Sequence, residues 1–324
     1  MRKVLFIGGS INQTSQMHQI ARELPEFQPY FTPYYADKGL EKFLTKMGLT
    51  RTTVLGEKLV NRCRTYLQDH RLNIDFGGES HDYDLVFTGS DLVIQENIRH
   101  LPIVLVQEGM TDPENWLYHL YKSMPFLPRW TAGTATNGLS DAYRYFCVAS
   151  EGYRDLFISK GVQPEKIRVT GIPNFDNCQR YYDNDFPHRD FVLVCTSDAR
   201  ETFKFENRRR FIDRAVEIAA GRQLIFKLHP NENFARSTAE INRWAPGALV
   251  YTSGSAEEMI ANCQVLITAY STTVYVGLAL GKEVYSDIDL EDLKRLTPLQ
   301  NGNAARQIAE VGRELLNPVH AQAC

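Results

Sequence analysis

The sequence lacks several features that would quickly assign a chain to a class of protein. Its six cysteines lie far apart, and no two of them have the spacing of metal ligands. No apolar run approaches the ~20 residues that a membrane-spanning helix needs. The net charge of -3 gives no chain-wide basic field for nucleic acid. We therefore predict a protein of a reducing, cytoplasmic compartment without a nucleic-acid partner.

The sequence does contain an alternation of short apolar runs and amphipathic stretches over 324 residues. Near-continuous apolar runs favour parallel strands buried on both faces, and the amphipathic stretches favour helices. The predicted strands are Lys3–Ile7, Pro29–Thr32, Leu85–Thr88, Ile103–Gln107, Tyr145–Ala149, Ile167–Val169, Phe191–Cys195, Gln223–Lys227, Leu249–Tyr251, Val265–Ile267 and Glu283–Tyr285. The predicted helices are Ser15–Leu24, Leu40–Met47, Val60–Asp69, Glu151–Lys160, Asn207–Ala220, Ala256–Ala261, Thr273–Leu280 and Asn303–Leu316.

This order of elements predicts an α/β fold with two doubly wound, Rossmann-like domains that face a cleft. A chain of this length suffices for two domains of ~150 residues each. A polar stretch near 174–188 interrupts the pattern, so we place the domains at 1–175 and 176–324. Ligands of such sheets bind outside the carboxyl ends of the strands. The residues that follow each strand are therefore the candidate site residues.

Three strand ends of the first domain carry such candidates. The first strand runs into GGSINQ, where the glycines let the backbone approach a ligand and Ser10 can cap the next helix. A plain tight turn explains this stretch equally well. Glu108, at a later strand end, fits either a base that takes a proton from a hydroxyl or the cap of a turn. The candidates for this side of the cleft are Gly8, Gly9, Ser10, Asn12, Asp91, Glu108 and Gly109.

The stretch KLHPNENF, at 227–234, follows a predicted strand of the second domain and precedes a helix-like segment. Lys227 supplies a fixed charge and His229 a ring donor, while Pro230 suits the first position of a helix. A helix N-terminus adds partial positive charge. The pattern therefore predicts that His229 contacts an anion.

Hydroxyl side chains follow two further strands of the second domain. Thr196 and Ser197 can donate to a phosphate or cap the next helix, and Arg208–Arg210 in that helix are expected on a solvated surface. Ser271, Thr272 and Thr273 precede an apolar helix, where backbone N–H groups and hydroxyls favour a phosphate. An ordinary N-cap is the alternative, although it needs only one of these three residues.

Taken in order, GGS, QEG, TGIPNFD, KLHPNE and ITAYSTTVYVGLALGK resemble the two-domain glycosyltransferases of the GT-B fold. The nearest resemblance is to bacterial sialyltransferases and Kdo transferases, and to CDP-glycerol glycerophosphotransferases. Their acidic-Gly motif matches Gln107-Glu108-Gly109, where a glutamine replaces the first acidic residue and leaves Glu108 as the base. Their HP motif, which contacts the donor phosphate, matches His229-Pro230, and their serine pair matches Ser271-Thr272.

The resemblance implies a metal-independent, inverting glycosyltransferase of cell-envelope glycan or glycolipid synthesis that needs no cofactor. Its partners are a CMP-, CDP- or UDP-linked sugar donor and a glycan or glycolipid acceptor. Glu108 and His229 are the implied catalytic residues. The implied donor-binding residues are Lys227, Pro230, Thr196, Ser197, Ser271, Thr272 and Thr273.

Two alternatives stay open. The sequence also resembles the non-hydrolysing UDP-GlcNAc 2-epimerases, whose glutamate segment and His turn map to Gln107-Glu108-Gly109 and to 229–233. The glycines of their diphosphate loop are replaced by Ser271 and Thr272 here. The glutamine at position 107 also fits a catalytically inactive sugar-nucleotide-binding protein.

The segment WLYHLYKSMPFLPRW, at 116–130, combines aromatic and basic residues. This mixture suits peripheral contact with the inner face of a membrane. It equally suits a loop and helix that pack on their own domain or cover an acceptor cleft.

Overall fold

The computed structural model describes residues 1–38, 55–124, 127–202 and 205–317. The chain forms two compact units: unit 1 comprises Met1–Asp176 with Asn301–Cys324, and unit 2 comprises Asn177–Gln300. Each unit is built on one parallel sheet, so the predicted α/β class with two doubly wound units is confirmed. The predicted helix Leu40–Met47 lies outside the described residues. No helix within these ranges is both long and apolar enough to cross a bilayer.

The sheet of unit 1 has the strand order β2-β1-β3-β4-β5-β6. Every neighbouring pair is parallel. Because β2 and β3 flank β1 on opposite sides, the winding direction changes between β1 and β3, which marks a ligand crevice at their carboxyl ends. The bounds are β1 (Lys3–Gly8), β2 (Gln28–Pro33), β3 (Leu85–Thr88), β4 (Ile103–Val106), β5 (Tyr145–Val148) and β6 (Ile167–Val169).

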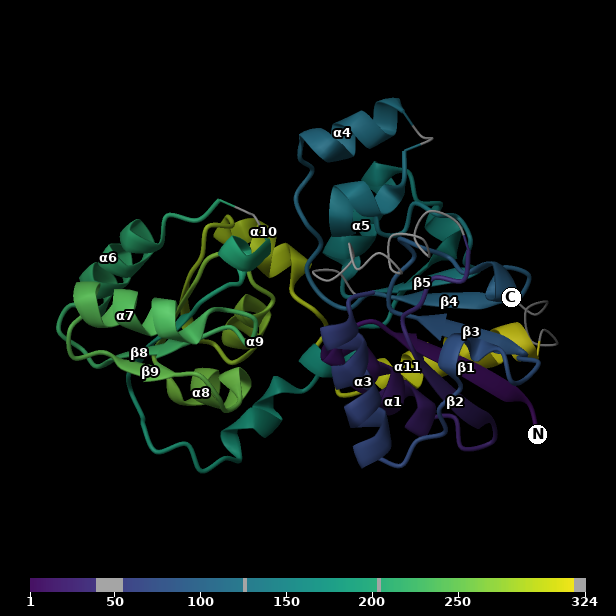
Figure 1. Ribbon diagram of the computed structural model, residues 1–324, viewed down its shortest axis with the longest axis horizontal. Helices are drawn as coiled ribbons and strands as arrows, with labels where there is room; N and C mark the ends of the chain where they lie inside the picture. Colours follow the sequence, from purple (N-terminus) through teal and green to yellow (C-terminus); the bar gives the residue numbers. More distant parts are fainter. Residues whose placement is uncertain (39–54, 125–126, 203–204, 318–324) are drawn as a thin grey trace. The chain divides into compact units, whose positions relative to one another are not determined.

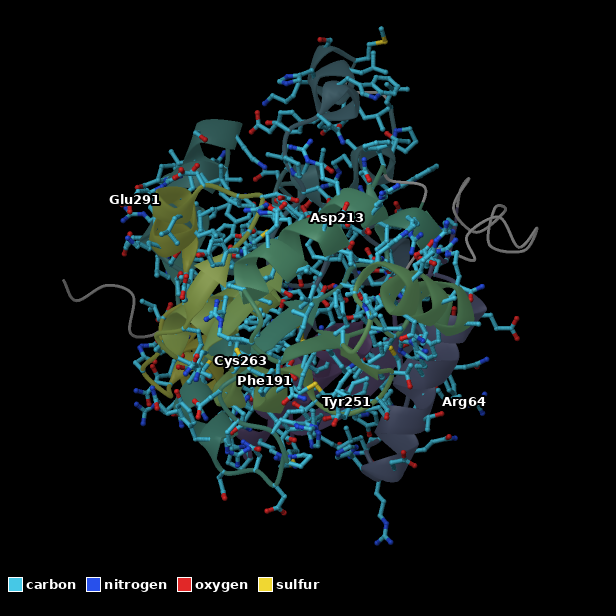
Figure 2. The ribbon with its side chains drawn as sticks, turned by 90° about the vertical axis from the view of Figure 1, so that its left-hand side faces the viewer. Arg64, Phe191, Asp213, Tyr251, Cys263 and Glu291 are labelled. Atoms are coloured by element: carbon cyan, nitrogen blue, oxygen red, sulfur yellow. The ribbon has the colours of Figure 1, made fainter. Side chains whose placement is uncertain are left out.

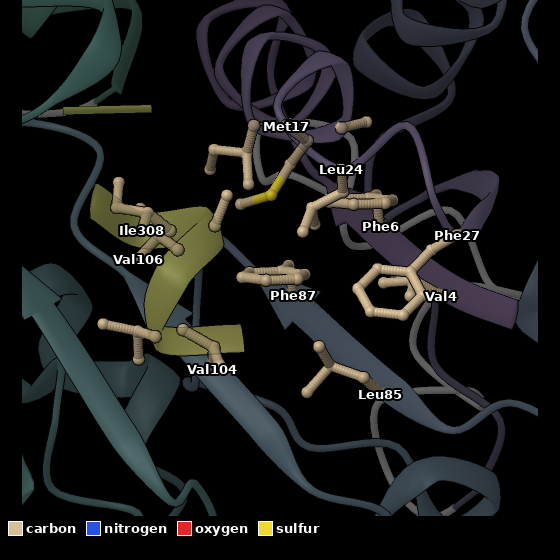
Figure 3. Packing of buried hydrophobic residues seen from close by; sticks show 14 of the residues in the cluster. Val4, Phe6, Met17, Leu24, Phe27, Leu85, Phe87, Val104, Val106 and Ile308 are labelled. Carbon is tan, nitrogen blue, oxygen red and sulfur yellow. The ribbon is translucent and has the colours of Figure 1, made fainter. Parts of the chain in front are cut away.

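One face of this sheet packs on an apolar cluster of unit 1. Phe6 of β1 stacks on Phe31 and Phe87 of the adjacent strands, with ring centroids 5.2 and 5.1 Å apart. Met17 and Ile308 cover these rings from two helices (Figure 3). Figure 1 shows α1, α3 and α11 on this face and α5 on the other. The bounds are α1 (Ile11–Arg22), α3 (Glu57–Asp69), α4 (Trp116–Ser123), α5 (Glu151–Lys160) and α11 (Ala304–Leu316).

The last helix corrects the predicted domain boundary. Residues after position 300 were assigned to the second domain, whereas α11 belongs to unit 1. Ile308 is fully buried in the unit 1 core. A Cβ on Gly312 would lie only 2.5 Å from Cζ of Phe87, so the helix backbone lies directly against that ring. An apolar helix face specifies burial but does not specify which sheet it will cover.

The sheet of unit 2 has the order β11-β10-β7-β8-β9, again with all neighbouring pairs parallel. Its winding changes between β7 and β10. The strands are β7 (Val192–Cys195), β8 (Leu224–Lys227), β9 (Leu249–Tyr251), β10 (Val265–Thr268) and β11 (Glu283–Tyr285). The helices are α6 (Arg208–Ala219), α7 (Phe234–Trp244), α8 (Ala256–Asn262), α9 (Thr273–Ala279) and α10 (Leu290–Leu296). Asp213 on α6 and Glu291 on α10 are surface positions of this unit (Figure 2).

Candidate functional site

In unit 1 the structure brings Glu108 and Ser10 together at the carboxyl ends of β4 and β1. The Ser10 hydroxyl donates to Oε1 of Glu108 at 2.6 Å. Gln13, which was not among the predicted site residues, donates from Nε2 to Oε2 of Glu108 at 2.6 Å. Burial raises the pKa of Glu108, while these two donors act in the opposite direction. The site is therefore a half-buried carboxylate with a donor on each oxygen.

The loop that carries Glu108 is braced by its neighbours. Gln107 is buried and uses both ends of its amide: Nε2 donates to the Gly109 carbonyl at 2.8 Å, and Oε1 accepts from the Ala149 N–H at 2.9 Å. A carboxylate at position 107 cannot donate to a carbonyl. The glutamine at this position is thus explained by backbone support, which leaves Glu108 as the acidic residue of this turn.

The glycine turn after β1 has a packing role. A Cβ on Gly8 would lie 2.7 Å from Oγ1 and 2.9 Å from Cα of Thr14, so Gly8 allows α1 to approach the strand. Ser10 is the N-cap of α1 and accepts from the Gln13 N–H. Asn12 is exposed, and its carbonyl accepts from Asn174 at 2.7 Å.

Asp91 is a correction to the predicted cleft residues. Its side chain is 0% exposed and lies 3.0 Å from Nη1 of Arg129. Its two carboxylate oxygens also accept from the backbone N–H groups of Gly138 and Ser140, at 2.9 and 3.0 Å. A carboxylate enclosed in this way anchors the 129–140 segment. It has no accessible oxygen for a substrate.

In unit 2 the His-Pro turn projects a partly exposed imidazole from the carboxyl end of β8. The His229 side chain is 39% exposed. Its Nδ1 accepts from the Asn231 N–H at 3.2 Å, and Oδ2 of Asp198 lies further away, at 3.6 Å. We therefore assign the proton of the neutral ring to Nε2. The ring can present an N–H donor to an anion.

Glu232 is a buried residue that holds this turn, and it was not among the predicted site residues. Its side chain is 0% exposed and lies 2.5 Å from Nη2 of Arg208. Its Oε2 accepts from the His229 N–H at 2.9 Å and from the Thr196 hydroxyl. Arg208 is 4% exposed, so the prediction that all three consecutive arginines lie on a solvated surface is wrong for Arg208.

The two hydroxyls after β7 are already committed within the protein. Thr196 is buried and donates to Glu232, and the Ser197 hydroxyl donates to Oε2 of Glu206 at 3.0 Å. Both protons therefore go to carboxylates, which corrects their assignment as phosphate donors. Lys227 is 7% exposed and donates to the Leu228 carbonyl at 3.0 Å. Burial lowers the pKa of Lys227.

The hydroxyls after β10 are arranged differently. Thr272 is the N-cap of α9 but makes no side-chain capping hydrogen bond, whereas Oγ of Ser271 accepts from the Thr273 N–H at 3.4 Å, so the N-cap alternative fails for Thr272 and stays open for Ser271. Ser271 and Thr273 pair with each other, their oxygens 3.0 Å apart. All three residues are partly exposed. Pro230, the remaining predicted donor residue, is exposed beside His229.

The aromatic segment at 116–130 contains α4, and residues 125–126 lie outside the description. Tyr118 packs with Ala132 and Ala135 in an apolar cluster of unit 1, as expected of a helix that packs on its own domain. Trp116 is 71% exposed, and membrane contact stays a prediction. Among the described residues, no three His, Cys, Asp or Glu side chains gather as metal ligands would.

Two doubly wound units, each with polar side chains at the carboxyl ends of its strands, define a chain of the GT-B fold. Solved structures confirm this fold class. The wall teichoic acid polymerase TagF matches with a TM-score of 0.52 and 13% identity over 98% of this chain and 90% of its own. No family model matches the sequence, and no curated protein matches it significantly.

Two UDP-GlcNAc 2-epimerases have the same fold. The enzyme from Methanocaldococcus jannaschii, in complex with UDP-GlcNAc and UDP, matches with a TM-score of 0.55 and 13% identity, over 96% of this chain and 99% of its own. The enzyme from Neisseria meningitidis, bound to UDP-GlcNAc, matches with a TM-score of 0.52 and 12% identity, over 98% of this chain and 92% of its own. Both resemblances drawn from the sequence thus lead to the fold that the structure has.

Proposed function

We propose that the protein is a metal-independent, inverting glycosyltransferase that transfers a sugar from a nucleotide-activated donor to a hydroxyl acceptor. The observation that carries the proposal is the environment of Glu108, a half-buried carboxylate held by Ser10 and Gln13 at the carboxyl end of β4, with a pKa raised by burial. A carboxylate with a raised pKa is better matched to proton removal from a hydroxyl near neutral pH than an ordinary one.

In this proposal Glu108 takes the proton of the acceptor hydroxyl as its oxygen forms a bond to the anomeric carbon. The bond from that carbon to the phosphate oxygen breaks, and the nucleotide leaves with the bonding electrons. Charge that develops on the phosphate is stabilised by donors already in place. The Nε2–H of His229 and the Ser271 and Thr272 hydroxyls are the proposed donors in unit 2.

The solved structures support a nucleotide-sugar partner. TagF is a wall teichoic acid polymerase, and one of its variants was soaked with CDPG. The Methanocaldococcus epimerase binds UDP-GlcNAc and UDP. We propose by analogy a CMP-, CDP- or UDP-linked donor and a glycan or glycolipid acceptor of the cell envelope. We place the reaction in the cytoplasm, at the inner face of the membrane.

A 2-epimerase is the second candidate, because a UDP-N-acetylglucosamine 2-epimerase structure matches with a TM-score of 0.56. The loop after β10 argues against it, since Ser271 and Thr272 replace glycines that let the backbone reach a diphosphate in that family. Interconversion of UDP-GlcNAc and UDP-ManNAc without an acceptor would support the epimerase. An inactive binding protein is less consistent with the site, because Gln107 has a structural explanation and Glu108 keeps its carboxylate.

The test is Glu108→Gln, assayed with nucleotide sugars and a panel of glycan and glycolipid acceptors. We expect turnover to fall by about 10²–10⁴-fold, the usual contribution of a general base, while donor affinity stays within about twofold. Glu151→Gln is the matched control, because that side chain is 68% exposed and pairs only with a residue of its own helix among the described contacts. Full turnover in Glu108→Gln would show that Glu108 is not the base.

A further inference from the structure

Among the described residues, Ser10 and Gln13 donate hydrogen bonds to the Glu108 carboxylate, and Gln13 was not among the candidate site residues. It is 4% exposed and lies in the first turn of α1, between the ends of β1, β3 and β4. We propose that Gln13 is a positioning residue that fixes the orientation and the ionisation of Glu108. The inference rests on the proposed function only in treating Glu108 as the base. The geometry itself is independent of the reaction.

The Gln13 amide has a single allowed orientation. Its Oε1 accepts from the Gly9 N–H at 2.6 Å. A flipped amide would place its NH₂ group against that N–H, donor against donor. The Nε2 atom therefore points to the other side, where it donates to Oε2 of Glu108 at 2.6 Å and lies 3.5 Å from the Gly89 carbonyl.

Gly89, at the carboxyl end of β3, leaves room for this arrangement. A Cβ at that position would lie 2.8 Å from both Cγ and Cδ of Gln13. Any larger residue would displace the Gln13 side chain, and with it the donor on Glu108. The glycine is thus required by the position of Gln13 in the crevice between β1 and β3.

The second carboxylate oxygen is fixed by the same helix turn. The Ser10 Oγ accepts from the Gln13 N–H at 3.1 Å, so its own proton is directed to Oε1 of Glu108. Gln16, one turn further along α1, donates to the Gln107 carbonyl at 3.1 Å and holds the chain just before Glu108. Ser10 and Gln13 of the α1 N-terminus therefore hold the Glu108 carboxylate, and Gln16 of α1 holds the backbone that precedes it.

These contacts affect the pKa of Glu108. Burial raises the pKa of this carboxyl, and donors that bind the ionised form lower it. Among the described residues, the Cys63 thiol of α3 is a titratable group that interacts with Glu108; its pKa is raised mainly by burial and also by the charge of Glu108. Loss of the Gln13 donor should leave Glu108 protonated to a higher pH. It should also leave Oε2 of Glu108 without this donor, so that the carboxylate group can rotate.

The experiment titrates Glu108 directly in the full chain. Protein labelled with ¹³C at the glutamate carboxyl carbons is followed by NMR against pH, and Glu108→Gln assigns the signal. We expect Gln13→Leu to shift the Glu108 midpoint upward. Gln19→Leu is the control, because Gln19 lies on the same helix and donates to Asn174 rather than to Glu108. An unchanged midpoint in a folded Gln13→Leu protein would overturn the proposal.

Gly89→Ala supplies a second variant that keeps Gln13 itself. We expect the same upward shift, because the added methyl group displaces the amide. In a transfer assay both variants should lower kcat by up to about a hundredfold, with KM for the donor little changed and the acid limb of the pH profile moved upward. If Glu108→Gln retains full turnover while the midpoints still shift, the proposed function fails and the positioning role stands.

Discussion

The Nη2 atom of Arg208 lies 2.5 Å from Oε1 of Glu232, and the two side chains are only 3% and 0% exposed. This pair supports the His-Pro turn directly, since Glu232 also accepts from the His229 N–H. A buried charge pair stabilises a fold less than its geometry suggests, but loss of one partner leaves the other charge buried alone.

We therefore expect Arg208→Gln to lower the free energy of unfolding of unit 2 by about 3 kcal/mol. The adjacent Arg209→Gln is the control. Its side chain is 71% exposed and lies 3.7 Å from Asp213, so its removal should change stability by less than about 0.5 kcal/mol. Chemical denaturation measures both. Equal effects of the two substitutions would contradict the structural role of Arg208.

Asp176 connects the point where the chain leaves unit 1 to the point where it returns. It is 5% exposed, and its two oxygens accept from the N–H groups of Gly302 and Ala304 at 2.6 and 2.7 Å. Asp176→Ala leaves both amides without these acceptors, and we expect a loss of about 1–3 kcal/mol. Hydrogen exchange should show the loss at the start of α11. The prediction would be refuted if the amides at the start of α11 were as well protected in Asp176→Ala as in the control Asp185→Ala, whose substituted residue is exposed.

His18 predicts a pH dependence of stability in unit 1. Burial, with Arg22 and the His70 ring nearby, lowers its pKa from 6.5 to about 4. Its Nδ1 lies 3.2 Å from the Tyr66 hydroxyl, and its ring meets Phe31 edge-on. The folded state therefore disfavours the proton that the unfolded chain accepts.

The stability contributed by neutral His18 is complete above pH 6.5 and is lost as the pH falls from there toward 4. Each pH unit by which the pKa is lowered corresponds to ~1.4 kcal/mol, and with solvent screening of the ring the loss is on the order of 1–3 kcal/mol. Denaturation at pH 7, 5.5 and 4.5 measures it, with His18→Phe as the comparison. We expect a shallower decline in His18→Phe. An identical decline in the two proteins would assign the acid sensitivity to other groups.

The sequence predicted the strands better than the helices and the site. All eleven strands occur within one residue of their expected ends, because continuous apolar runs bounded by polar turns specify buried parallel strands. The helix α10 was missed, since Leu290–Leu296 is short and has only one fully buried position, Leu293. The placement of α11 depended on which sheet its apolar face covers, and local sequence does not encode this.

Only part of the site was predicted, because local sequence shows which residues follow a strand but not which distant residues contact them. Glu108 and His229 follow strands directly, so the topology alone directs attention to them. Gln13 and Glu232 act through contacts with residues far away in the chain, at separations of 95 positions to Glu108 and 36 to Thr196. Thr196 and Ser197 have the composition of phosphate donors, but the carboxylates that accept their protons become apparent only in three dimensions.

The most direct test of the central claim is nucleotide binding at the His-Pro turn. Thermal stabilisation by CMP, CDP, UDP, GDP, dTDP and UDP-GlcNAc should be compared in the wild type, in His229→Ala and in the exposed control His119→Ala. A ligand at 100 times its Kd should add ~2.7 kcal/mol. We predict that a cytidine or uridine nucleotide stabilises the wild type and His119→Ala but not His229→Ala. Absence of stabilisation by every nucleotide, or equal stabilisation of all three proteins, would contradict a donor-phosphate site at His229.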